Sequence, residues 1–497
     1  MRIGSILLAG SIAASTAGAA DTRLADAVKK DDLKTVRALI AQKADVNAPQ
    51  ADGTTALHWA AYQDDIEAAR LLLKAGASSN TVNRYGVTPL SLACTNGNGA
   101  MVELLLQSGA DPNLALPGGE TPLMTAARTG RVEAVRSLIA RKVDLNAKEA
   151  RGQTAIVWAA AEGNVEAVEE LIKAGADYKA KLNTGFTPYL MAAREGQLGV
   201  VRALLKAGVD INESLQPSGG GRGGLGSGSK AARPGDSALH LAVGNAHYEL
   251  AAFLLDAGAD PNHNGPGYTP LHMIPSVRKP GGGDNDPSPD GSGAMTSLEF
   301  IRKMAAKGAN LNARMTRRTN FGLTSLNTMG ATPFCLAARS ADAELMRFLA
   351  SLGADPLIPT ADGATPLIVA AGLGTRSPGE DAGTDEEVVA AVKAAIDLGN
   401  DPNAIDKNGE TAMHGAAYKN VADAVRYIAA HGAKPEVWNQ PNKQGWTPLT
   451  IAEGYRFGNF KPSPPTIAAF LEVMKAAGIS PKQDNKSGIS DYISKKQ

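Results

Sequence analysis

The stretch SLQPSGGGRGGLGSGSKAARPGD, residues 214–236, contains the glycine spacing G-x-G-x-x-G at Gly221, Gly223 and Gly226. This spacing holds a dinucleotide phosphate when a strand leads into it and a helix follows, because that frame aims backbone amides at the phosphates. No strand pattern precedes these glycines, and no acidic residue follows at the place where it would bind a ribose. We therefore interpret the stretch as a loop rich in glycine and serine, and we expect no cofactor.

A second stretch, GGGDNDPSPDGSGAM, has the residue types of a calcium loop. Asp286, Ser288, Asp290 and Gly291 match the first half of that pattern. The twelfth position is Ser297, whereas a calcium loop has a bidentate glutamate there. We interpret the stretch as an acidic loop without a metal, and the calcium site remains as the weaker alternative.

Histidines and cysteines are the remaining candidates for chemistry. The phrases TAL, SAL, TPL and TAM each precede a histidine, at positions 58, 240, 272 and 414. These histidines lack the H-E-x-x-H spacing of a zinc protease, and the chain has no G-x-S-x-G nucleophile motif. Cys94 and Cys335 lie in apolar helical stretches, where a small buried side chain is the expected role. We assign no catalytic residue and predict that the protein is not an enzyme.

Composition and charge exclude several classes of partner. The 497 residues include 50 Lys and Arg and 50 Asp and Glu, so no overall field attracts nucleic acid or an anionic membrane. Aromatic residues make up 5 %, which favours closely stacked small helices. Two cysteines are too few for a disulfide framework. We expect another protein as the partner and a monomeric chain.

The first residues have the pattern of a secretory signal peptide. Arg2 precedes an apolar run that ends in small residues at 17–20. Glycine, serine and threonine interrupt the run, which falls short of the roughly 20 apolar residues that a membrane span needs. We predict that residues 1–20 are removed and that the mature chain is not inserted in a membrane. It would be exported, to the periplasm of a Gram-negative organism and otherwise to the outside.

A search for the elements that position these residues finds one phrase repeated along the chain. It reads GTTALHWAA at Gly53 and GETPLMTAA at Gly119, and its opening glycines stand at residues 53, 86, 119, 152, 185, 235, 267, 330, 363, 409 and 445. The glycine allows a turn with positive φ, threonine caps a helix, and proline suits the first helical turn. A second apolar helix follows and ends in GADPN at 109–113 and 258–262. Each unit is therefore a helix pair that must stack on its neighbours.

These phrases and endings resemble the ankyrin repeat family. The resemblance implies a mainly α fold, an α-solenoid of about twelve helix-turn-helix units with short hairpin fingers. It also makes the four histidines after TAL, SAL, TPL and TAM hydrogen-bonding staples of the turn. The predicted organisation is a signal peptide at 1–20, an N-terminal capping repeat at 21–52, regular repeats at 53–213, a glycine-rich finger insertion at 214–234, insertion-bearing repeats with a C-terminal cap at 235–479, and a polar tail at 480–497.

Long insertions depart from the repeat only in the C-terminal half. The first five opening glycines are 33 residues apart, and the later spacings are 50, 32, 63, 33, 46 and 36 residues. Insertions at 214–234 and 314–329 fall in the fingers beside the concave groove. Insertions at 275–293, 374–384 and 455–465 interrupt the helix pairs, so we expect them at the opposite rim.

Two groups of residues in this half are candidates for partner binding. The finger insertions carry the basic residues Arg222, Arg233, Arg314, Arg317 and Arg318. The C-terminal segment carries Trp438, Trp446, Tyr455, Arg456 and Phe457, which are residue types that anchor interfaces. The alternative for the first group is solvated charge that keeps the loops soluble. The alternative for the second is packing that seals the end of the stack.

The sequence therefore predicts a non-enzymatic interaction scaffold of an exported compartment. A protein partner would bind in the concave groove and on the C-terminal insertions. The competing hypothesis is a ligand- or calcium-binding protein, or an enzyme, with its site among those insertions around Asp284, Asp286, Asp290 and Arg456.

Overall fold

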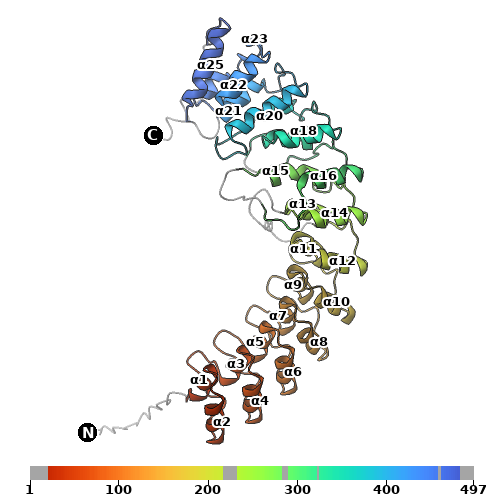
Figure 1. Cartoon of the computed structure of the whole chain (residues 1–497), viewed down its shortest axis with the longest axis vertical. Coiled ribbons are helices and arrows are strands. Elements are labelled where there is room, and N and C mark those ends of the chain that lie inside the picture. Colours follow the sequence, from red (N-terminus) through yellow and green to blue (C-terminus); the bar gives the residue numbers. More distant parts are fainter. Residues whose placement is uncertain (1–20, 217–231, 282–288, 322–323, 457–460, 482–497) are drawn as a thin grey trace, which may run out of the picture. The chain divides into compact units, whose positions relative to one another are not determined.

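The computed structural model describes residues 21–216, 232–281, 289–321, 324–456 and 461–481. Within these ranges it contains 25 α-helices, one short 3-10 helix and no strand (Figure 1). The fingers are turns, and the one β-bridge among the described residues pairs Ser214 with Ser237. The mainly α class is confirmed.

The helices alternate between a first and a second helix of each pair. The first helices are α1 (Arg23–Lys29), α3 (Ala56–Tyr62), α5 (Pro89–Asn96), α7 (Pro122–Thr129), α9 (Ala155–Glu162), α11 (Pro188–Arg194), α13 (Ala238–Gly244), η1 (Pro270–Met273) with α15 (Ile274–Arg278), α17 (Pro333–Arg339), α19 (Pro366–Ala370), α21 (Ala412–Lys419) and α24 (Pro448–Ala452). The second helices are α2 (Leu33–Ala41), α4 (Ile66–Lys74), α6 (Gly99–Gln107), α8 (Val132–Ile139), α10 (Val165–Ala174), α12 (Leu198–Lys206), α14 (Tyr248–Asp256), α16 (Ser297–Ala306), α18 (Ala343–Ser351), α20 (Asp385–Asp397), α22 (Ala422–Ala430) and α25 (Pro464–Ala476). A short extra helix, α23 (Pro435–Trp438), precedes the last pair. The described residues thus form the twelve pairs that the repeats predict.

The chain divides into two compact units. The first is Met1–Ala159 with Glu166–Asp177, and the second is Ala160–Val165 with Tyr178–Gln497. In the first unit, α1, α3, α5 and α7 pack side by side, as do α2, α4, α6 and α8. In the second unit, α11 packs on α13, and α17, α19, α21 and α24 form one row beside the row of α18, α20, α22 and α25.

The opening phrase folds as its residue types dictate. In GVTPLSLAC, Thr88 Oγ1 accepts a hydrogen bond of 3.0 Å from the Ser91 backbone N–H, and Pro89 occupies the first turn. Gly86 has a φ of +77°, and a Cβ there would lie 2.3 Å from Pro117 Cδ in the next finger. Glycine is therefore required both by the turn and by the close approach of the following repeat.

The interior is built from small side chains and buried aliphatic ones. Ala60 and Ala61 of α3 and Leu72 of α4 are fully buried, and the small alanine surface of α3 lets α4 approach closely. Cys94 and Cys335 are also fully buried, and burial raises the pKa of each thiol to about 12. Both cysteines are buried core residues, as the sequence predicted.

Three histidines of the repeat, His58, His240 and His272, join their unit to the next. His272 Nδ1 accepts from the Thr269 backbone N–H at 3.1 Å, so the proton is on Nε2, which donates to the Ala331 carbonyl at 3.2 Å. His240 repeats this arrangement with Ser237 and the Tyr268 carbonyl. Each accepting carbonyl belongs to the residue after the next opening glycine. The predicted role as a turn staple is confirmed.

The staple makes stability depend on pH. Burial lowers the pKa of folded His272 from 6.5 to about 4. Between these values the unfolded chain binds more protons, so the contribution of His272 is complete above pH 6.5 and is lost on acidification by up to about 1.4 kcal/mol per pH unit. In chemical denaturation, the stability advantage of the wild type over His272→Gln should shrink from about pH 7.5 to about pH 5. A constant advantage would contradict the burial of the neutral ring.

Candidate functional site

The finger insertion at 314–329 folds back onto the helices of the second unit. Phe321 is buried, and its ring meets the Tyr268 ring edge-on at 5.1 Å. The Arg233 guanidinium lies over both rings, 5.6 Å from the Tyr268 centroid and 5.2 Å from that of Phe321. Arg339 of α17 donates to the Phe321 carbonyl at 2.7 Å. The insertion therefore packs against several repeats.

The same insertion meets the segment that follows α19. The Ser325 backbone N–H donates to the Gly374 carbonyl at 2.9 Å, and the Thr324 hydroxyl donates to it at 3.2 Å. The start of the 374–384 insertion thus lies against the finger insertion, and the prediction that it sits at the opposite rim is wrong for these residues. The reason is that α19 ends at Ala370, and Gly372 and Gly374, with φ of +119° and +90°, turn the chain back.

These two insertions and three consecutive fingers line an open cavity of about 220 Å³. Its walls come from the finger insertion, the segment after α19, the fingers before α19, α21 and α24, and the end of α21. The lining residues are Ser325, Leu326, Asn327, Thr360, Asp362, Ala364, Leu373, Gly374, Thr375, Asp406, Asn408, Glu410, Tyr418 and Gln444. We call this space the finger cavity.

All the charged side chains that line the finger cavity are acidic. Asp362, Asp406 and Glu410 contribute carboxylates, and the lining includes no lysine, arginine or histidine. Burial raises the pKa of Asp406, and the neighbouring charge of Asp362 raises it further. The cavity therefore concentrates negative charge that the lining itself does not neutralise.

Glu410 is the most constrained of the three acids. It is 5 % exposed, and its Oε1 accepts from Asn442 Nδ2 at 2.9 Å and from the Tyr418 hydroxyl at 3.1 Å. Its Oε2 is buried without a hydrogen-bond partner among the described residues. Burial raises the pKa of Glu410 to about 7, and the charge of Asp406 contributes to the rise.

The chain itself provides a comparison for Glu410. Three repeats place an acid directly after the opening glycine, at Glu120, Asp236 and Glu410. Arg128, eight residues after Glu120, lies 3.8 Å from its carboxylate. Asp236 accepts from the Arg233 backbone N–H at 2.7 Å; burial raises the pKa of Asp236 to about 6, and this hydrogen bond and the charge of Arg233 limit the rise. Glu410 forms no ion pair with a described residue, because Tyr418 occupies the place that Arg128 has.

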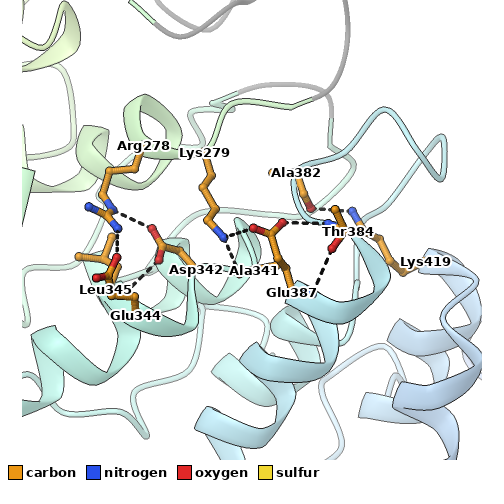
Figure 2. A network of polar contacts seen from close by, with 10 residues as sticks. All are labelled: Arg278, Lys279, Ala341, Asp342, Glu344, Leu345, Ala382, Thr384, Glu387 and Lys419. Carbon is orange, nitrogen blue, oxygen red and sulfur yellow. Dashed lines mark hydrogen bonds and ion pairs between the residues drawn. The ribbon is translucent and has the colours of Figure 1, made fainter.

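A network of polar contacts links the repeats on the side of the helix-helix turns (Figure 2). Arg278 binds Asp342 Oδ2 and Glu344 Oε2, each at 2.7 Å. Lys279 binds Glu387 at 2.5 Å, and the Thr384 backbone N–H donates to the same carboxylate. This network connects α15, α18 and α20, whose repeats carry the walls of the finger cavity. The first turn of α20 carries Asp385, Glu386 and Glu387, and this position at the helix N-terminus favours negative charge.

The basic candidates for partner binding have separate environments. Arg233 is half-buried and holds Tyr268, whereas Arg314, Arg317 and Arg318 are exposed. Arg314 donates to the carbonyls of Gly330 and Pro359, and Arg318 donates weakly to that of Ser325. Arg222 lies outside the described residues. The structure thus leaves three exposed arginines of this group at the surface.

The aromatic candidates are mostly interior. Trp438, Trp446 and Arg456 are 1 %, 8 % and 1 % exposed, and Trp438 packs 6.0 Å from Phe470 of α25. These three side chains are buried in the last repeats, as the packing alternative predicts. Tyr455 is half-buried, and Phe457 lies outside the described residues.

The calcium candidate is largely outside the described residues. Asp284, Asp286 and Ser288 fall there, and Asp290 is exposed. Throughout the ranges that the structure describes, no group of three His, Cys, Asp or Glu side chains is arranged to hold a metal ion.

Comparisons with known proteins agree with the repeat architecture. The family profile described as "Ankyrin repeats (3 copies)" matches residues 24–115, 123–214 and 384–460, and the profile "Ankyrin repeat" matches 234–265. The chain belongs to the ankyrin repeat family. The crystal structure of the human ASB11 ankyrin repeat domain is similar over 44 % of this chain and 90 % of that domain, at 27 % identity and a TM-score of 0.38. Ankyrin repeats generally mediate protein–protein interaction, and ankyrin repeat proteins are typically non-enzymatic.

The wall of the finger cavity depends on Gly374. A Cβ there would lie 2.6 Å from the Leu326 backbone N. Gly374→Ala should therefore release the 324–326 wall and cost about 1–3 kcal/mol from the positive φ alone. Amide exchange of Ser325 should accelerate. Gly353→Ala is the matched control, since Gly353 has a φ of +99° and open space around its Cβ position. Equal effects of both substitutions on Ser325 exchange would contradict this contact.

The acidity of the cavity can be measured at Glu410. Carboxyl ¹³C NMR of the glutamate-labelled protein should show this group titrating near pH 7, above its ordinary value of 4.5. Asp406→Asn removes a neighbouring negative charge and keeps an oxygen that accepts the Glu410 backbone N–H, so the titration midpoint should fall. A wild-type midpoint near the ordinary value would refute the desolvation of Glu410.

Proposed function

We propose that this ankyrin repeat protein is a non-enzymatic scaffold that holds a protein partner on the fingers of its second unit, around the finger cavity. The repeats supply a stiff frame, and the fingers supply the variable surface. The partner would cover the exposed tips of three consecutive fingers. Arg318 is exposed beside Ser325, which lines the cavity, and contributes positive charge at its edge.

The observation that carries the proposal is the position of exposed apolar side chains. Met329, Leu357 and Ile405 are 42 %, 49 % and 55 % exposed, and all three lie in finger segments of the second unit. Backbone hydrogen bonds hold these fingers together, from Ala361 N–H to the Met329 carbonyl and from Lys407 N–H to the Asp362 carbonyl. Exposed apolar side chains that gather on neighbouring fingers are the kind of surface that binds a protein partner.

The proposal includes the compartment. Arg2 and the apolar run after it support export with removal of residues 1–20, to the periplasm of a Gram-negative organism or otherwise outside the cell. Among the helices of the described residues, none combines the length and the apolar character that crossing a bilayer requires. We propose a monomer whose partner is a different protein.

The test is affinity capture from the exported fraction of the native cell. The double variant Met329→Ser with Ile405→Ser should lose a partner that the wild type retains, because both anchors of the surface become polar. Leu471→Ser is the matched control, since Leu471 is 46 % exposed on α25 and lies away from the fingers. Retention of every partner by the double variant, or loss of the same partner from the control, would place the binding surface elsewhere.

A further inference from the structure

We infer that the finger cavity receives one basic side chain, arginine or lysine, from the protein partner. This inference rests on the proposed function, because it assigns the chemistry of the group that enters the proposed binding surface. The ligand of the cavity would thus be an organic cation that is part of a peptide.

The first support is the combination of space and uncompensated charge. The cavity of about 220 Å³ is lined by three acids and by the amide or hydroxyl groups of several polar residues. Asp362 accepts from Asn327 Nδ2 at 2.9 Å, and Asp406 accepts from the backbone N–H groups of Asn408 and Glu410. These bonds position the carboxylates without neutralising them, and none of the three forms an ion pair with a described residue.

The second support is the unpartnered oxygen of Glu410. A buried carboxylate normally has both oxygens satisfied by donors, because an unpaired buried charge is costly. Glu410 Oε2 has no donor among the described residues, although Glu410 is only 5 % exposed. In the repeat of Glu120, Arg128 supplies an intramolecular cation, and the repeat of Glu410 has no equivalent. A guanidinium or ammonium group from a partner would supply the same charge at Glu410.

The third support favours a peptide over a free small cation. Asn327 and Asp406 line the cavity, and two exposed apolar side chains, Met329 and Ile405, lie within two positions of them in sequence. A basic side chain that enters the cavity would bring its own backbone and neighbours across these apolar tips. A free cation would leave both tips exposed to water.

Cation binding should be coupled to proton release. The titratable groups that contact or neighbour Glu410 are Asp406 and Tyr418, and Arg456 lies behind Tyr418, to whose carbonyl it donates. Glu410 has a pKa of about 7, so about half of the molecules carry its proton at that pH. A bound cation stabilises the carboxylate, which lowers its pKa and releases the proton.

The experiment uses isothermal titration calorimetry on the full chain, with the end-blocked pentapeptides LARAL and LAQAL as probes. LARAL should bind about tenfold more tightly than LAQAL, the effect expected for one charge-assisted hydrogen bond. Titrations at pH 7 in buffers of different ionisation enthalpy should show release of about half a proton per LARAL bound. Equal binding of the two peptides would overturn the inference.

Variants separate the role of the cavity from general effects on folding. Tyr418→Arg copies the internal cation of Glu120 and should remove the preference for LARAL, and Glu410→Gln should abolish the proton release. Glu120→Gln, in the first unit, is the matched control and should leave both measurements unchanged. If Tyr418→Arg retains the LARAL preference and Glu410→Gln retains the proton release, the cavity is not the site.

Two further outcomes distinguish the inference from the proposed function. Blocked single arginine, N-acetylarginine methylamide, should bind more weakly than LARAL; equal affinity would overturn the assignment to a peptide while leaving an organic cation site. A partner captured equally by the wild type and by Tyr418→Arg would overturn the role of the cavity and leave the scaffold function intact.

Discussion

The structure depends on hydrogen bonds that one finger cannot complete by itself. A repeat turn exposes backbone carbonyl and N–H groups that its own short helix pair does not satisfy, so the next repeat must supply the partners. The staple histidines give a side-chain N–H to the carbonyl of the following repeat. Finger backbones add N–H donors along the row, as between Lys443 and Asn408. Stacking is therefore a polar requirement as well as an apolar one.

Because neighbouring fingers must stack closely, the surroundings of an acid in a finger depend on the adjacent repeat. The position after each opening glycine is held close to the neighbouring finger; the carboxylate there is buried at Asp236 and Glu410 and partly exposed at Glu120. In the first unit Glu120 meets Arg128, and in the second Asp236 lies beside Arg233. Glu410 occupies the same position with a tyrosine hydroxyl and an amide as its donors. Its environment follows from the repeat geometry and from one difference between repeats, the tyrosine at the place where the repeat of Glu120 has an arginine.

The regular parts of the fold could be predicted from the sequence, because the residue types of the repeated phrase each favour one local structure. Glycine allows the turn, threonine caps the helix and proline suits the first helical turn. The structure shows these roles in GVTPLSLAC and in the other copies of the phrase along the chain. Helix pairing and the buried cysteines followed from the residue pattern, and the staple histidines followed from the resemblance to the ankyrin repeat family. The burial of Trp438 and Trp446 was open, since aromatic residues suit an interface and a core equally well.

The finger cavity could not be predicted in the same way. Its walls come from segments that are far apart in sequence, and the contact between Ser325 and Gly374 depends on where α19 ends. A signal did exist: eight residues after the acid, Glu120 is followed by Arg128, whereas Glu410 is followed by Tyr418. That difference has no meaning until the repeat geometry shows that the two side chains meet.

The insertions also change how the two units should fold. In the first unit the helix contacts join each repeat to its neighbours, an arrangement that can assemble and open piece by piece. In the second unit Arg233 reaches Asn320 across 87 positions, and Lys279 reaches Glu387 across 108, past the intervening pair of α17 and α18. Such links require distant parts of the chain to be in place together, which slows folding and makes local opening more costly. These links make the second unit the more cooperative of the two blocks.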